Sequence, residues 1–116
     1  MLLLLPLCAQ PPQEGTKKGP PPAPKNLKIL KPEDIRPMMR SFTIALGQRC
    51  DFCHVQGDFA SDEKPQKLMA RHMIEMTQHI NAQFPDGKEH VTCYTCHRGV
   101  ELPLTAPPAT PPAGGN

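Results

Sequence analysis

The residues best spaced for chemistry are four cysteines in two close pairs, each with a histidine directly after it. The two segments read Cys50-Asp51-Phe52-Cys53-His54 and Cys93-Tyr94-Thr95-Cys96-His97. On a helical turn, thiols three positions apart lie on the same side of the chain. This is the attachment pattern of c-type haem, in which both thiols bond the porphyrin edge and the following histidine ligates the iron. We therefore expect two covalently bound haem c groups, with iron ligands His54 and His97.

Other uses of paired cysteines fit this sequence less well. A zinc site built from two such pairs usually has a shorter interval between them, and zinc needs no histidine directly after each pair. A thioredoxin-like dithiol needs a strand-helix-strand setting, which this sequence does not indicate. Structural disulfides rarely join cysteines so close together. The repetition of the complete pattern favours haem.

The composition indicates a protein that folds around its cofactors. The 116 residues suffice for one small domain, and small domains bury a small share of their surface. There is no Trp, one Tyr and four Phe, so side chains contribute little aromatic bulk to a core. The formal net charge of +2 is too small to indicate a nucleic acid partner, and none is expected.

Two helices must position the two cysteine segments, and we predict a small all-α fold without a β-sheet. The first helix begins near Pro32-Glu33-Asp34 or Pro37 and ends at Gly47. The second is predicted over residues 63–84, with Ser61 or Asp62 as its N-cap and a proline in the first turn. One face of the second helix carries an apolar stripe at helical spacing: Met69, Met73, Met76, Ile80 and Phe84.

The two ends of the chain are rich in proline and predict extended tails around one folded domain. We expect an export-like start and Pro-rich tail over residues 1–28, a two-haem cytochrome domain over 29–101 and a Pro-rich tail over 102–116. The apolar residues 1–9 are too few to span a bilayer. The segment Leu5-Pro6-Leu7-Cys8 loosely resembles a lipoprotein cleavage site, at which Cys8 would be lipidated. The alternative is that Cys8 belongs to an export segment and is removed with it. The expected location is periplasmic or extracellular, with membrane association left open.

Several further segments form a pattern around the two motifs: Leu46-Gly47, residues 59–64, Ala70-Arg71-His72-Met73, Glu75-Met76-Thr77, Ile80-Asn81 and residues 91–99. With these segments the folded part resembles the cytochrome c subunit of photosynthetic reaction centres. Four-haem members of that family look like two two-haem halves. The resemblance implies that this chain corresponds to one such half.

The resemblance also implies the second ligand of each iron. In that family, a Met from the helix before each haem segment usually binds the iron opposite the histidine. Carried over by position, this residue is Met39 for the first haem, with Met38 as the alternative, and Met73 for the second. Thioether ligation stabilises ferrous iron and raises the potential. The other candidates on the second helix are then packing or solvent-facing residues: Met69, Met76, His72 and His79.

These features predict an electron carrier outside the cytoplasm rather than an enzyme. A haem peroxidase or sensor would need an open iron and an acid-base residue above it, and no residue in the sequence marks such a group. The Pro-rich tails suggest arms that run along neighbouring copies, so the expected assembly is an extracellular cytochrome filament. The alternatives are a haem subunit of a photosynthetic or respiratory membrane complex and a soluble periplasmic shuttle. The partners are accordingly other copies of the chain or redox proteins.

Overall fold

The computed structural model describes residues 19–110, and all its regular elements are helices. In chain order they are η1 (Pro32–Asp34), α1 (Ile35–Leu46), α2 (Cys50–Cys53), α3 (Pro65–Ala82) and α4 (Cys93–His97). Pairing of strands within this range is limited to one isolated bridge, between Val55 and Asp58. The predicted all-helical fold is therefore confirmed, with each long helix followed by a short turn that carries a cysteine pair. The export-like residues 1–9, including Cys8, lie outside the described residues.

Helix α1 ends where the sequence predicts. Gly47 follows it with a φ of 62°, a left-handed conformation that glycine adopts without a steric penalty. A Cβ atom at this position would overlap the carbonyl oxygen of Gly99, which lies just beyond α4. The amide of Gly99 in turn donates to the carbonyl of Ala45 at 2.8 Å. The end of the first helix is thus joined closely to the turn that follows the second cysteine pair.

Helix α3 begins later than predicted. Its N-cap is Lys64, and Pro65 occupies the first helical position. The predicted caps, Ser61 and Asp62, are wrong because both side chains have other partners. The Ser61 hydroxyl accepts from the amide of Glu63 at 3.2 Å, and the Asp62 carboxylate forms ion pairs with side chains of α3.

The end of α3 also differs from the prediction, since the helix stops at Ala82 rather than Phe84. Gln83 and Phe84 close the helix with tighter hydrogen bonds, to the carbonyls of Ile80 at 3.1 Å and Asn81 at 3.2 Å. The early stop turns the chain back toward α4. The physical reason is the Asn81 side chain, which forms hydrogen bonds with the loop segment that leads back to α4.

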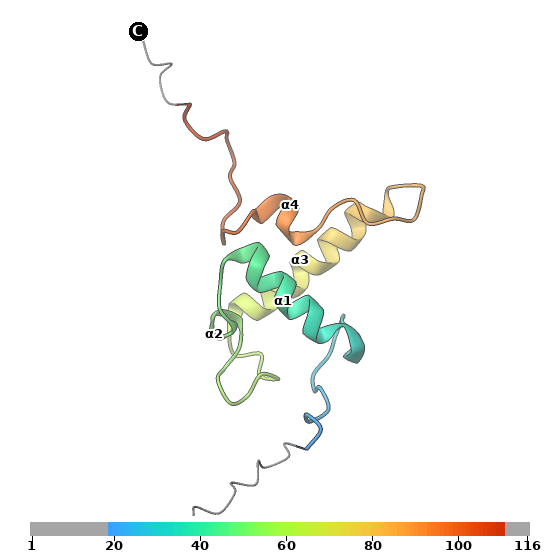
Figure 1. Ribbon diagram of the computed structural model, residues 1–116, viewed down its shortest axis with the longest axis vertical. Coiled ribbons are helices and arrows are strands. Elements are labelled where there is room, and N and C mark those ends of the chain that lie inside the picture. Colours follow the sequence, from blue (N-terminus) through green and yellow to red (C-terminus); the bar gives the residue numbers. More distant parts are fainter. Residues whose placement is uncertain (1–18, 111–116) are drawn as a thin grey trace, which may run out of the picture.

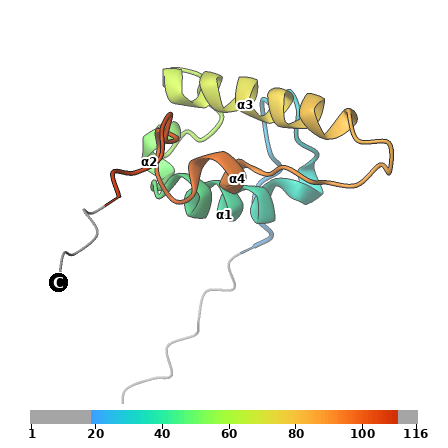
Figure 2. The same cartoon turned by 90° about the horizontal axis from the view of Figure 1, so that it is seen from above.

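The two halves of the chain pack crosswise. Helix α1 contacts α4, the short helix α2 contacts α3, and α3 also contacts α4. Figure 1 shows α1 crossing in front of α3, and Figure 2 shows α4 between these two helices with α2 at one end. Each cysteine turn therefore packs on the long helix of the other half rather than mainly on the helix that precedes it.

The protein side chains alone form very little core. Among the described residues only Ala45 and Ile74 are buried apolar residues, with 1% and 8% of their surface exposed. Twelve large apolar side chains in the same range are exposed, several of them on α3. The range also holds no helix that is both long and apolar enough to cross a membrane. The shortage of core matches the expectation that cofactors supply apolar bulk.

Candidate haem-binding sites

The first cysteine pair lies on α2, a single helical turn that starts after the extended residue Arg49. His54 ends this turn, and its amide donates to the carbonyl of Cys50 at 2.9 Å. The Nδ1 atom of the His54 ring lies 2.9 Å from the carbonyl oxygen of Phe59. A carbonyl oxygen only accepts, so Nδ1 carries the proton and the lone pair of Nε2 is left free to bind a metal. A hydrogen bond from the other ring nitrogen to a backbone carbonyl is typical of metal-binding histidines, because it fixes the orientation of the ring.

The second pair repeats this arrangement on α4. The hydroxyl of Thr95 accepts from the amide of Thr92 at 2.9 Å and holds the start of the turn. The Nδ1 atom of His97 lies 3.1 Å from the carbonyl oxygen of Val100. Arg98 has a φ of 54°, so the chain reverses directly after His97 and brings that carbonyl back to the ring. In both histidines Nε2 is therefore the ring nitrogen whose lone pair is left free.

The cysteines do not have the environment of a reactive redox dithiol. Burial raises the pKa of the Cys53 and Cys93 thiols, whereas a reactive dithiol needs a lowered thiol pKa. The four described cysteines form no disulfide. No three His, Cys, Asp or Glu side chains within residues 19–110 are placed to hold one metal ion. The zinc alternative, which needs both pairs to converge, has no support in this range.

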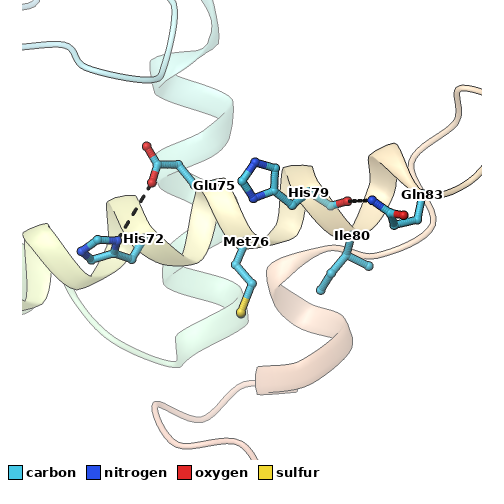
Figure 3. A pocket seen from close by; sticks show the side chains of 6 residues that line it. All are labelled: His72, Glu75, Met76, His79, Ile80 and Gln83. Carbon is cyan, nitrogen blue, oxygen red and sulfur yellow. Dashed lines mark hydrogen bonds and ion pairs between the residues drawn. The ribbon is translucent and has the colours of Figure 1, made fainter.

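An uncovered apolar stripe on α3 lies beside the second cysteine turn. Met69, Met76 and Ile80 have 54%, 48% and 37% of their surface exposed. In Figure 3, Met76 and Ile80 point to the side of α3 on which α4 lies, and both line a shallow pocket of about 470 Å³. Met69 and Met76 were predicted to be packing residues, but protein side chains leave about half of each exposed. Helix α3 contacts α4, so this exposed apolar surface lies on the helix that packs against the second cysteine turn.

The proposed methionine ligands lie on the two long helices. Met39 and Met38 on α1 and Met73 on α3 are all half-buried, and Met73 is more covered than its neighbours on the stripe. No contact in the structure distinguishes Met39 from Met38, so the methionine ligands stay predictions. His72, whose side chain is 78% exposed, and the exposed His79 lie on the surface of α3, as expected.

Sequence reasoning missed the part played by Asn81. Its side-chain amide donates to the carbonyl of Val91 at 2.7 Å, while its oxygen accepts from the amides of His90 and Val91, both at 2.9 Å. These three bonds close the loop between α3 and α4. The ring of His90 also stacks on Phe84, with centroids 4.1 Å apart. Asn81 therefore fixes the position of the second cysteine turn relative to α3. The only signal in the sequence was the Ile80-Asn81 segment of the resemblance.

The chain is similar in sequence to known cytochromes. The chain is 36% identical over 86 residues to the photosynthetic reaction center cytochrome c subunit of Rubrivivax gelatinosus, a match that covers 68% of this chain and 23% of that protein. It is 34% identical over 92 residues to the protein of the same name from Thermochromatium tepidum, covering 71% and 22%. Cytochrome c-554 of Chloroflexus aurantiacus is 45% identical over 58 residues, covering 46% and 14%.

The chain spans less than a quarter of the length of these relatives. Residues 12–110 match the family described as photosynthetic reaction centre cytochrome C subunit, a range that includes both cysteine pairs and both long helices. That match covers most of the sequence. The two cysteine turns with their carbonyl-bound histidines and the family match lead to the same assignment: this chain belongs to the photosynthetic reaction centre cytochrome c subunit family.

Proposed function

We propose that this chain carries two covalently attached haem c groups and passes single electrons between redox partners outside the cytoplasm. The observation that carries this proposal is the repeated environment of His54 and His97. Each follows a cysteine pair on one helical turn, and each has Nδ1 bound to a backbone carbonyl, which leaves Nε2 for iron. The haem, when bound, supplies a one-electron iron couple.

The chain's own residues hold and orient the two groups. Cys50 and Cys53 form the thioethers of the first site, and Cys93 and Cys96 those of the second. Met39, with Met38 as the alternative, and Met73 would hold the two irons through their thioether sulfurs. Their half-buried positions on α1 and α3 support this assignment. With a histidine and a methionine both held by each iron, a bound haem would supply electron transfer as the chemistry of each site.

We favour a subunit of a membrane redox complex over the filament expected from the tails. The relatives from Rubrivivax gelatinosus and Thermochromatium tepidum are named as subunits of photosynthetic reaction centres. The filament lacks a comparable observation, since no comparison points to it and residues 1–18 and 111–116 lie outside the described range. Electron microscopy and sedimentation of the purified holoprotein test this choice. Regular fibres would overturn it, and discrete particles support it.

The haem content has a direct test. Acid-acetone extraction of the purified holoprotein should leave the red colour on the polypeptide, and mass spectrometry should find two haems on the chain. A redox titration should then show two one-electron steps. Colour that extracts into the solvent, or a chain that contains zinc and no iron, would contradict the proposal.

Carbon monoxide separates an electron carrier from a haem sensor or peroxidase. With both axial positions filled, the reduced protein should bind carbon monoxide slowly and incompletely at neutral pH. Fast stoichiometric binding would show that one iron has an open position and would favour the sensor or peroxidase.

A further inference from the structure

The carbonyl oxygen of Phe59 has two donors, and this distinguishes the first histidine from the second. It lies 2.9 Å from Nδ1 of His54 and 2.9 Å from the ammonium of Lys67. A carbonyl oxygen has two lone pairs, so it can accept both hydrogen bonds together. The corresponding carbonyl of Val100 accepts from His97 at 3.1 Å, and no described side-chain cation donates to it. The two carbonyls that bind the histidines therefore differ, because only that of Phe59 also accepts from an ammonium group.

Lys67 is held firmly in this position. Its ammonium also donates to the carbonyl of Ser61 at 2.8 Å and lies 3.3 Å from the carboxylate of Asp62. Only 13% of the Lys67 side chain is exposed. A charged side chain that is largely covered by protein is less screened than a fully exposed one, so it acts more strongly on nearby groups.

The ion-pair cluster around Lys67 keeps a positive charge. Asp62 also pairs with the guanidinium of Arg71 at 2.9 Å, and Arg71 donates to the backbone of Asn26 at 3.3 Å. Hydrogen bonds from Arg71, Asn26 and Lys67, in that order of importance, hold the pKa of Asp62 well below its usual range. The carboxylate therefore stays ionised, but it is shared between two cations. It cannot neutralise both of them.

The Lys67 ammonium weakens the hydrogen bond between His54 and the Phe59 carbonyl. Two donors on one oxygen compete for its electron density, so the hydrogen bond from His54 Nδ1 is weaker than it would be without Lys67. A weaker bond at Nδ1 gives the imidazole less anionic character, and Nε2 then donates less density to iron. The nearby positive charge also disfavours the ferric state. Both effects raise the reduction potential of the site at His54.

We propose that Lys67 is a positioning residue that makes the His54 site the higher-potential site of the two. Electrons inside the chain then move from the His97 site to the His54 site. This inference rests on the proposed function, because it needs two haems with reversible one-electron couples. It adds a direction of transfer, which depends on a side chain that neither attaches nor ligates a cofactor.

The test compares Lys67→Met with a matched control in the full-length holoprotein. Lys64→Met is the control, because the Lys64 ammonium donates to the carbonyl of Asp51 in the same cysteine turn, not to the oxygen used by His54. Spectroelectrochemical titration of Lys67→Met should show one midpoint potential lowered and the other unchanged. Lys64→Met should shift the same potential less. Lys67→Arg, which keeps the charge and its donors, should stay near the wild-type values.

Two NMR readouts test the route through the carbonyl. In the reduced proteins, only the Nδ1 proton resonance of His54 should move in Lys67→Met, and that of His97 should not. In partly oxidised wild-type protein, the haem attached to Cys50 and Cys53 should be the last to lose its electron. This second readout needs no variant, so it tests the direction of transfer even if Lys67→Met fails to fold.

The outcomes separate this inference from the proposed function. An unchanged pair of potentials in Lys67→Met, an equal shift in Lys64→Met, or a wild-type protein in which the His97 site has the higher potential overturns the role of Lys67. In those cases the two reversible couples remain. A wild-type protein without two reversible couples refutes the proposed function itself.

Discussion

Replacing Gly47 with alanine is expected to destabilise the protein far more than the same change at Gly87. The two glycines have nearly the same positive φ, 62° and 67°. A Cβ at Gly87 would meet no atom within 4 Å, whereas a Cβ at Gly47 would overlap the carbonyl oxygen of Gly99. The pair therefore separates the cost of the backbone conformation from the cost of the contact between the two halves of the fold.

The expected magnitudes follow from these surroundings. A left-handed conformation costs a residue with a Cβ about 1–2 kcal/mol, and alanine recovers about 0.4–1 kcal/mol by restricting the unfolded chain. Gly87→Ala should thus lose about 1 kcal/mol. Gly47→Ala must also push the chain at Gly99 away from α1. This breaks the hydrogen bond from Gly99 to Ala45, worth about 1 kcal/mol, and strains the packing by about 1–3 kcal/mol. The total for Gly47→Ala is about 3 kcal/mol or more.

Guanidinium unfolding of both holoproteins, followed by far-ultraviolet circular dichroism, measures the two free energies of unfolding. The guanidinium concentration at the midpoint should fall clearly further for Gly47→Ala than for Gly87→Ala. The slope of the free energy of unfolding against guanidinium concentration should not change. The visible spectrum of Gly47→Ala should also change, because the displaced turn carries the carbonyl bound by His97. Equal losses at Gly47 and Gly87 would refute the close contact between α1 and the turn after α4.

Three further predictions concern individual side chains. Asn81→Ala removes three hydrogen bonds and should lower the free energy of unfolding by about 2–3 kcal/mol, while the exposed control Gln78→Ala should change it by less than about 0.5 kcal/mol in the same denaturant assay. Asp62 has a lowered pKa in the folded state, so its stabilising contribution is present above the unfolded pKa of about 3.9 and is lost as the pH falls through its folded pKa. In an acid titration, Asp62→Asn should therefore lose less stability below about pH 4 than the wild type does. Met73→His should lower one midpoint potential and remove one methionine-iron charge-transfer band, whereas Met69→Leu should change neither.

Each of these three predictions has a result that would contradict it. Equal stability of the Asn81 and Gln78 variants would mean that the loop does not depend on the amide. An unchanged acid profile in Asp62→Asn would mean that the carboxylate keeps its ordinary pKa in the folded protein. If Met73→His leaves both the potential and the band in place, the ligand is another residue.

Much of the architecture could be predicted because its signals are local. Gly47 ends α1 as predicted, since only glycine adopts a left-handed conformation without strain. Pro65 lies at the start of α3, where its missing N–H is not needed. The errors at the ends of α3 have a common cause. Ser61, Asp62 and Asn81 use their side chains on partners that lie elsewhere along the chain, and helical periodicity carries no information about such partners.

The sequence by itself determined the chemistry, because the thiols and the histidine of each site lie within five consecutive residues and one helical turn brings them together. Only the tertiary structure decided which carbonyls orient His54 and His97, since backbone atoms carry no signature in the sequence. It also brought Lys67 to the oxygen that His54 uses, from thirteen positions further along the chain. Two sites with the same motif thus differ in their surroundings, because a hydrogen bond between distant residues depends on how the helices pack.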